Sequence, residues 1–265
     1  MNELLGSIGR RVIGVFSFYT GLISLLYYSI ATHFSKRTRG KKIVYNIAIQ
    51  QIYFTGVQAL GIIGLIAFAF GAIIGLVVFQ IAVGLSPTAK DYAGFIMVMS
   101  LVDVLGPLIT AIIVIARSGT AMATEIANMV VRNEMLALES MAINTLNYIV
   151  LPRVVGMVVS IVCLVVFFCV VAVVTVMGLA WFVDPANEFG KTAALFFAEM
   201  DFFKVLGIVV KAVFFGCGIS LICIINGFKV LMYPGGAPVS GIRGVVGSLQ
   251  YVVVVGGILT VLFLL

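Results

Sequence analysis

Long apolar runs separated by shorter polar intervals dominate the chain from residue 43 onward. A helix needs about 20 predominantly apolar residues to cross a bilayer, and several of these runs are at least that long. Most of them contain no formal charge. The pattern therefore predicts five membrane-spanning helices, at about residues 55–83, 93–116, 154–183, 205–227 and 244–265.

The polar intervals between these runs differ in length and charge. Residues 84–92 predict a short turn, and residues 184–204 are net acidic. Residues 228–243 are rich in glycine and proline and predict a connector. The longest interval, residues 117–153, has few helix breakers between Ala121 and Ile143 and predicts a helix outside the membrane.

The N-terminal part, residues 1–54, has a different pattern. Residues 12–35 are uncharged and long enough to span, but bases flank them on both sides: Arg10, Arg11, Lys36, Arg37, Arg39, Lys41 and Lys42. Bases on both flanks favour a helix that lies in the membrane interface, with a span as the alternative. Residues 43–54 predict an amphipathic lead-in. We therefore separate residues 1–54 from a transmembrane domain of residues 55–265.

Composition supports this division. Hydrophobic residues make up 63% of the 265-residue chain and charged residues only 10%, whereas about a quarter of a soluble domain is charged. These values predict an all-α integral membrane protein. The net charge of +6 does not indicate a nucleic-acid partner, because the bases lie at the membrane edges.

The distribution of bases predicts the orientation of the chain. With the N-terminus in the cytoplasm, twelve bases fall on the cytoplasmic side and only Lys90, Lys191 and Lys204 on the other. Such an excess is typical of cytoplasmic loops. We expect residues 117–153 in the cytoplasm, and residues 184–204 and the C-terminus outside it.

The sequence lacks the usual signatures of catalysis and of nucleotide binding. It contains no GxxxxGK[ST], HExxH or GxSxG motif, and His33 is its one histidine. The four cysteines lie inside apolar runs and form no CxxC pair. We expect no catalytic residue, metal site or cofactor in this chain.

Two ionisable residues, Asp103 and Lys211, interrupt the apolar runs. Ionisable groups within a membrane usually face an interior or a cavity, often in pairs. At about 1.5 Å of rise per residue, the two positions differ in depth by roughly one helical turn. One hypothesis pairs them within the bundle or across a dimer. In the other, Lys211 extends toward the surface and Asp103 meets water in a cavity.

Small residues and one proline mark candidate packing positions. Gly71 and Gly75 have the spacing that lets helix backbones approach closely. Packing within one chain would explain them, and a face toward a dimer partner or a lipid pocket is the alternative. Gly106 and Pro107 predict a kink in the second span.

The interval of residues 117–153 also has a helical pattern of its own. Asn128, Arg132 and Glu139 recur at four- and seven-residue steps, near one face. An adjacent apolar strip is formed by Met135, Leu138 and Met141. A short helix with an apolar strip and flanking charges suits docking into a groove of a partner. A solvated loop helix without a partner is the alternative.

The motifs GP-x₈-AR-x-G-x-A-x₃-E, E-x₄-E-x-M and LPR lie between Leu105 and Arg153. Together they resemble the permease subunit of MlaE-type lipid ABC transporters, and the resemblance extends from about Thr55 to Leu265. It implies five spans preceded by an interfacial helix. It also implies that the cytoplasmic helix is a coupling helix seated on an ATPase. The ATPase-coupling residues would be Arg132, Glu134, Leu138, Glu139 and Met141.

The resemblance further implies the partners of such a subunit. The permease would work as a dimer in the bacterial inner membrane, and a separate ABC ATPase would bind ATP and Mg²⁺. A periplasmic MCE-domain protein would exchange phospholipid or a related lipid with it. The paucity of charge in the spans fits a lipid substrate better than an ion or a sugar.

Later segments resemble the family less closely. The family usually places a glutamate directly before its LGP motif, where this chain has Val104 and an acid one residue earlier, at Asp103. Gly256 stands where the family often has an acid, and Pro238–Ser240 differ as well. These departures indicate a diverged copy and leave homodimer and heterodimer open. A secondary transporter or channel, and a non-transporting membrane scaffold, are the alternatives in other functional classes.

Overall fold

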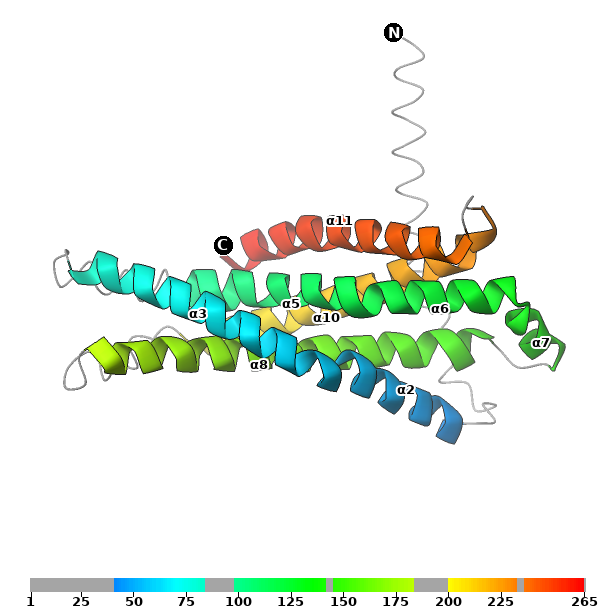
Figure 1. Cartoon of the computed structure of the whole chain (residues 1–265), viewed down its shortest axis with the longest axis horizontal. Coiled ribbons are helices and arrows are strands. Elements are labelled where there is room, and N and C mark those ends of the chain that lie inside the picture. Colours follow the sequence, from blue (N-terminus) through cyan, green and yellow to red (C-terminus); the bar gives the residue numbers. More distant parts are fainter. Residues whose placement is uncertain (1–40, 84–97, 142–144, 184–199, 233–235, 265) are drawn as a thin grey trace, which may run out of the picture.

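The computed structural model describes residues 41–83, 98–141, 145–183, 200–232 and 236–264 (Figure 1). The expected interfacial helix at residues 12–35 lies outside these residues, as do the turn at residues 84–92 and residues 184–199 of the outer loop. The described residues form helices and contain no strand. The predicted all-α class is confirmed.

Thirteen helical elements follow one another along the described chain: α2 (Lys41–Thr55), η1 (Val57–Ala59), α3 (Leu60–Val83), η2 (Val98–Leu105), α5 (Gly106–Val114), η3 (Ile115–Gly119), α6 (Thr120–Val131), α7 (Glu134–Ser140), η4 (Leu146–Val150), α8 (Leu151–Val183), α10 (Phe202–Phe228), η5 (Lys229–Met232) and α11 (Gly236–Leu264). Several are consecutive parts of one longer helix. Five helices are long and apolar enough to cross a membrane: Tyr45–Val77, Leu101–Val131, Tyr148–Leu179, Phe202–Met232 and Gly236–Phe263. The expected number of spans is confirmed.

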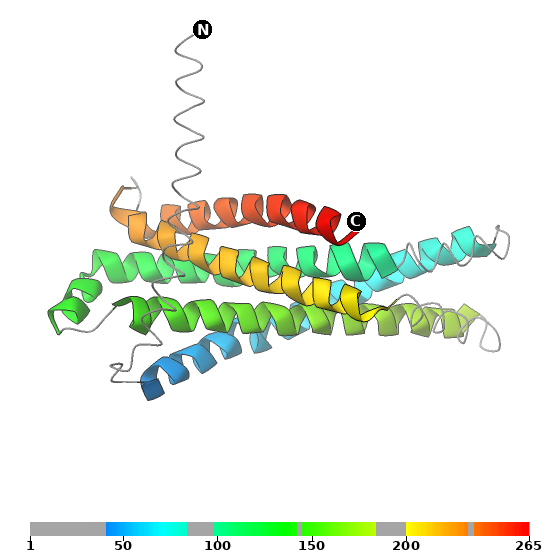
Figure 2. The ribbon, with the colours of Figure 1, turned by 180° about the vertical axis from the view of Figure 1, so that it is seen from behind.

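The long helix α8 lies at the centre of the bundle. It packs against α2 and α3 on one side and against α10 on another, and α5 also contacts it. The opposite layer consists of α6, α10 and α11, which pack on one another. Figures 1 and 2 show the long helices running roughly lengthwise, with α7 at one end of the bundle.

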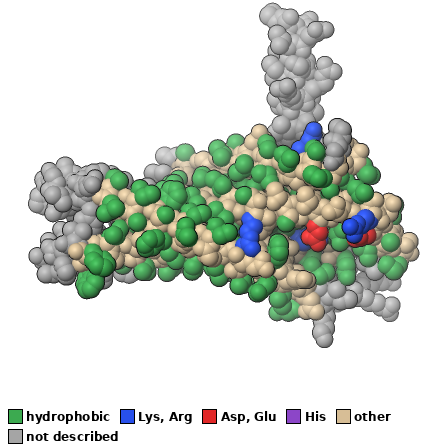
Figure 3. All heavy atoms as spheres, viewed as in Figure 1, with side chains coloured by type: hydrophobic (Ala, Val, Ile, Leu, Met, Phe, Trp, Pro, Cys, Tyr) green, Lys and Arg blue, Asp and Glu red, His purple; other side chains and the backbone are tan. Residues whose placement is uncertain are grey.

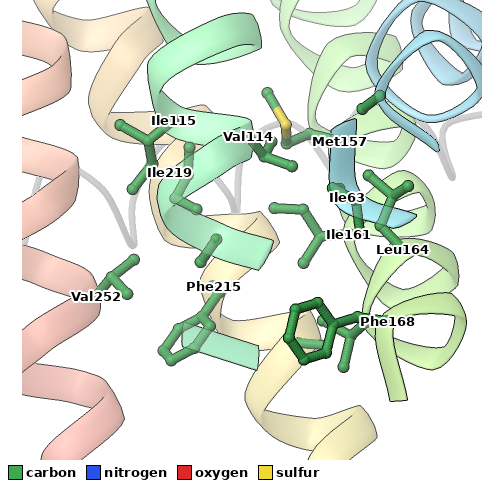
Figure 4. Packing of buried hydrophobic residues seen from close by; sticks show 14 of the residues in the cluster. Ile63, Val114, Ile115, Met157, Ile161, Leu164, Phe168, Phe215, Ile219 and Val252 are labelled. Carbon is green, nitrogen blue, oxygen red and sulfur yellow. The ribbon is translucent and has the colours of Figure 1, made fainter. Parts of the chain in front are cut away.

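Buried side chains from five helices form the core. Figure 4 shows Ile161 and Phe168 of α8 pointing toward side chains of α5 and α10. Phe168 and Phe215 are among the largest side chains that are fully buried. Many large apolar side chains of the described residues are also exposed, and the face shown in Figure 3 carries many of them. A protein that is apolar both inside and outside is expected where lipid is the solvent.

The first long apolar helix, Tyr45–Val77, begins earlier than residue 55 and contains a break next to the boundary expected between the lead-in and the first span. Gly56 separates α2 from η1 and α3, and Gln51 donates a hydrogen bond to Thr55 at 2.9 Å just before it. Residues 43–54, the expected lead-in, belong to α2, which packs on α8. A Cβ at Gly156 of α8 would lie 2.7 Å from the side chain of Gln51, so glycine permits this approach.

The second span continues further than residue 116. Its helix runs through η3 and α6 to Val131, so residues 117–131 continue the second long helix and pack within the bundle. The polar residues that indicated a loop are accommodated within the helix. Thr120 and Thr124 donate hydroxyl hydrogen bonds to carbonyls one turn earlier, at 2.8 and 2.9 Å. A Ser or Thr side chain can satisfy itself in this way without leaving the helix.

The last helix begins earlier than residue 244. Helix α11 starts at Gly236, within the expected connector. Gly236 has a φ of 68°, which glycine adopts without strain. Pro238 lies in the first turn, where the backbone N–H has no helical acceptor and its absence costs nothing. The glycine and proline content therefore marks a helix start in this chain.

Gly71 and Gly75 pack within the chain. A Cβ at Gly71 would lie 2.8 Å from the carbonyl oxygen of Ala172, and one at Gly75 would lie 3.3 Å from Leu179. Both contacts are with α8. The two glycines thus let α3 approach α8 closely. This contact corresponds to packing within one chain, one of the two roles considered for these glycines.

Candidate functional site

Two regions of the structure carry candidate function, and they lie in different parts of the bundle. One is the end formed by α6, α7 and the start of α8, which we call the coupling end. The other is a cleft between η2–α5, α10 and α11. On the face shown in Figure 3, the charged side chains of the described residues lie between the middle of the bundle and the coupling end.

The coupling end contains a break between α6 and α7. Asn133 has a left-handed backbone with φ 58° and ψ 20°, and Arg132 and Asn133 donate backbone hydrogen bonds that close the last turn of α6. Asparagine tolerates this conformation better than most residues. The continuous helix expected over residues 121–143 is therefore wrong, because the chain turns at Asn133.

Helix α7 holds most of the predicted coupling residues. Glu134, Glu139 and Met141 are exposed, whereas Leu138 is half-buried and Met135 packs against the core. Arg132, at the end of α6, lies 3.9 Å from Glu134. Asn128 and Arg132 belong to the α6 segment before the turn, so the single face expected for them with Glu139 is interrupted. The short helix presents two acids and little positive charge.

Arg153, the last residue of the LPR motif, is a functional candidate that was not among the predicted site residues. It lies in the first turn of α8, and its side chain is only 7% exposed. Its Nη2 lies 3.0 Å from Oε1 of Glu125 on α6 and 3.8 Å from the sulfur of Met129. The sequence shows Glu125 and Arg153 as charged residues of the interval 117–153. It does not show that they pair, because 28 positions and a change of helix separate them.

The cleft has a volume of about 310 Å³. Its walls are mostly apolar and come from three parts of the chain: Asp103, Val104, Pro107 and Leu108; Lys211 and Phe215; Val253, Gly256, Gly257, Thr260 and Val261. Residues such as Val253 and Val261 are more than half exposed, so the cleft borders the outer surface of the bundle. The size is at the lower end of small-molecule sites.

Asp103 and Lys211 form an ion pair in the wall of this cleft. Nζ of Lys211 lies 2.6 Å from Oδ1 of Asp103, and the two side chains are 2% and 13% exposed. The pairing hypothesis is confirmed, and the pair lies within one chain. Lys211 also lies 5.9 Å from the centre of the Phe263 ring. The site thus contains two opposite charges that neutralise each other.

Pro107 explains why Lys211 makes a second contact. Proline has no N–H and cannot bond the carbonyl four residues earlier, which is that of Asp103. Nζ of Lys211 donates to that carbonyl at 3.2 Å. The preceding helix is π-helical over Val98–Leu105, and such irregular turns frequently occur at functional sites. At Gly106 and Pro107, where a kink was predicted, the π-helix ends and the α-helix α5 begins, and Lys211 contacts this junction.

Residues 48–262 match the protein family described as permease MlaE. The chain is 31% identical to a probable ABC transporter permease protein of Rickettsia typhi, over 69% of this chain and 70% of that protein. It is 28% identical to a probable ABC transporter permease protein of Rickettsia felis, over 85% and 84%. It is 27% identical to the intermembrane phospholipid transport system permease protein MlaE of Haemophilus influenzae, over 81% of each chain.

Proposed function

The chain belongs to the MlaE permease family, and we propose that it is the membrane-spanning subunit of an ABC transporter that moves phospholipid or a related lipid. The transporter would exchange this lipid between the bacterial inner membrane and a periplasmic MCE-domain protein. The N-terminus would face the cytoplasm and the C-terminus the periplasm. The chain itself would carry no ATP, Mg²⁺ or catalytic residue.

The cleft is the observation that supports a lipid substrate most directly. Its walls are apolar, and its ionisable groups, Asp103 and Lys211, are already paired at 2.6 Å. An apolar cleft without an unpaired charge can accommodate a hydrocarbon chain without desolvating a polar group. It offers an ion or a sugar few groups to bind. The acyl part of a lipid fits the chemistry of these walls.

The coupling end supports an ATPase partner. Helix α7 projects from one end of the bundle, and its exposed residues include Glu134, Leu136 and Glu139, followed directly by the exposed Met141. Exposed apolar residues flanked by acids suit a groove with basic edges. ATP hydrolysis in the partner would move α7, and the bundle would transmit that movement to the cleft.

A second permease copy completes the proposed assembly. The cleft borders the outer surface, so a partner chain packed over α5 and α11 would enclose the lipid between two copies. The partner copy could be this same chain or a related one. The departures at Asp103 and Gly256 supply the reason to test for a related chain.

The test is a purification of the full chain in mild detergent, with mass spectrometry of its proteins and lipids. We expect an ABC ATPase, an MCE-domain protein and phospholipid to copurify. Glu134→Lys with Glu139→Lys should remove the ATPase and keep the lipid. Asp201→Asn is the control for loss of an acid, because asparagine keeps the cap that Asp201 forms at the start of α10.

Two results would contradict the proposal. Bound lipid without either protein partner in the wild-type preparation would favour a membrane scaffold. An ATPase that stays bound to the variant with both reversed charges would exclude α7 as its docking site. A second permease sequence in the wild-type preparation would identify a heterodimer.

A further inference from the structure

Helix α7 is connected to the rest of the bundle mainly through α6. It packs chiefly on α6, with Met135 as the side chain that reaches the core. Helix α6 is in turn held tightly by α10 and α11. A Cβ at Gly227 would lie 2.8 Å from Ile126, and one at Gly241 would lie 2.7 Å from Thr124. Any displacement of α7 therefore acts first on the layer of α6, α10 and α11.

The start of α8 has few direct contacts with this unit. Helices α6 and α8 barely pack on each other, although each packs extensively on α10. Arg153 bridges the space between them through its bonds to Glu125 and Met129. The hydrogen bond from Thr145 to Glu139, at 3.2 Å, is a second link to the segment that leads into α8, but it is exposed. Exposed contacts of this kind contribute little.

The burial of Arg153 makes this bridge stiff. Its guanidinium is nearly inaccessible, and its Nη1 has no hydrogen-bond partner among the residues the structure describes. Glu125 is 61% exposed, so water partly screens the pair, but separation would still leave the buried guanidinium of Arg153 without its counter-charge, which is unfavourable. Movement of α6 should therefore pull the first turn of α8 along with it and not break the pair.

We propose that Arg153 is a positioning residue that transmits displacement of the α6–α7 unit to α8 through Glu125. Helix α8 contacts α2, α3, α5 and α10, so its movement reaches both sides of the bundle. This role rests on the proposed function, because it presupposes an ATPase that moves α7. Arg153 is not one of the residues that line the cleft.

The test compares lipid transfer with ATP hydrolysis in one preparation. The transporter complex is reconstituted as it copurifies, in vesicles that contain a fluorescent phosphatidylethanolamine, and transfer to unlabelled acceptor vesicles is followed with ATP. Glu125→Gln removes the charge and keeps the shape, whereas Arg153→Lys keeps the charge. Asn128→Ala, an exposed change on the same helix, is the matched control.

For Glu125→Gln we expect ATPase copurification and ATP hydrolysis close to wild type. The amount of lipid transferred per ATP should fall about tenfold, which is a usual size for coupling between two sites. Arg153→Lys should keep most of the coupling, and Asn128→Ala all of it. Unchanged transfer per ATP in Glu125→Gln would overturn the role. A parallel fall in hydrolysis, transfer and thermal stability would also overturn it, because it would indicate a purely structural pair. If the wild-type complex itself neither hydrolyses ATP nor transfers lipid, the proposed function fails before any variant is compared.

Discussion

Lys211 donates to Asp103 twice, once to the carboxylate at 2.6 Å and once to the backbone carbonyl at 3.2 Å. The second bond satisfies a carbonyl that Pro107 cannot serve. One ammonium group therefore neutralises a buried acid and supports an irregular turn in the neighbouring helix. The wall of the cleft depends on both contacts, because Asp103, Pro107 and Lys211 all line it.

Removal of one partner of this pair should be costly. We expect Asp103→Asn and Lys211→Met each to lower the free energy of unfolding by about 3 kcal/mol, since each leaves the other group buried without its counter-charge. The double variant should lose much less than the sum of the two. Thermal unfolding in detergent of the wild type and all three variants measures this. Strictly additive losses would show that the two groups do not stabilise each other.

Close packing of α6 against α10 can be tested at Gly227. A Cβ there would lie 2.8 Å from the Cβ of Ile126 and 3.0 Å from the carbonyl oxygen of Ala123. We expect Gly227→Ala to destabilise the protein by about 1–3 kcal/mol through overpacking. Gly257→Ala is the matched control, because nothing lies within 4 Å of its added methyl group. It should be neutral or stabilise the helix by up to about 1 kcal/mol. Equal melting temperatures for the two variants would contradict the close approach.

The turn between α6 and α7 depends on the backbone of Asn133. Alanine at this position adopts the left-handed conformation only at a cost in free energy, whereas glycine adopts it freely. Asn133→Ala should therefore loosen α7, with amide hydrogen exchange of Glu134–Ser140 about fivefold faster, which corresponds to about 1 kcal/mol. Asn133→Gly should leave the exchange nearly unchanged. Equally fast exchange in the glycine and alanine variants would mean that the asparagine side chain, and not the backbone, holds the turn.

The sequence was sufficient for the class of the protein and for the number of spans. Apolar runs of membrane length are a strong signal, because a lipid environment requires every span to satisfy its own backbone. The boundaries were harder to predict. The second span was expected to end at residue 116, yet its helix continues to Val131. Polar side chains beyond residue 116 find partners there, as Arg117 does with Gln58 at 2.9 Å and Thr120 with the carbonyl of Ala116 at 2.8 Å.

The contacts between helices were only partly predictable. Asp103 and Lys211 could be paired from the sequence, because ionisable residues at similar membrane depth are rare and need partners. Glu125 and Arg153 could not, because charges near a membrane edge usually face water. The direction of the chain at Asn133 depends on a single backbone angle, for which asparagine is a permissive residue and not a specific signal.

The central position of α8 has a consequence for synthesis of the chain. Helices α2 and α3 leave the ribosome long before α8, which is their main neighbour, and α6 precedes both α10 and α11. The earliest segments must therefore persist as single helices in lipid, and assembly within the bilayer follows their insertion, as is common for helical membrane proteins. A nascent chain that stops before α8 would hold helices with almost none of their final contacts, and it would be exposed to quality-control proteolysis until the third span arrives.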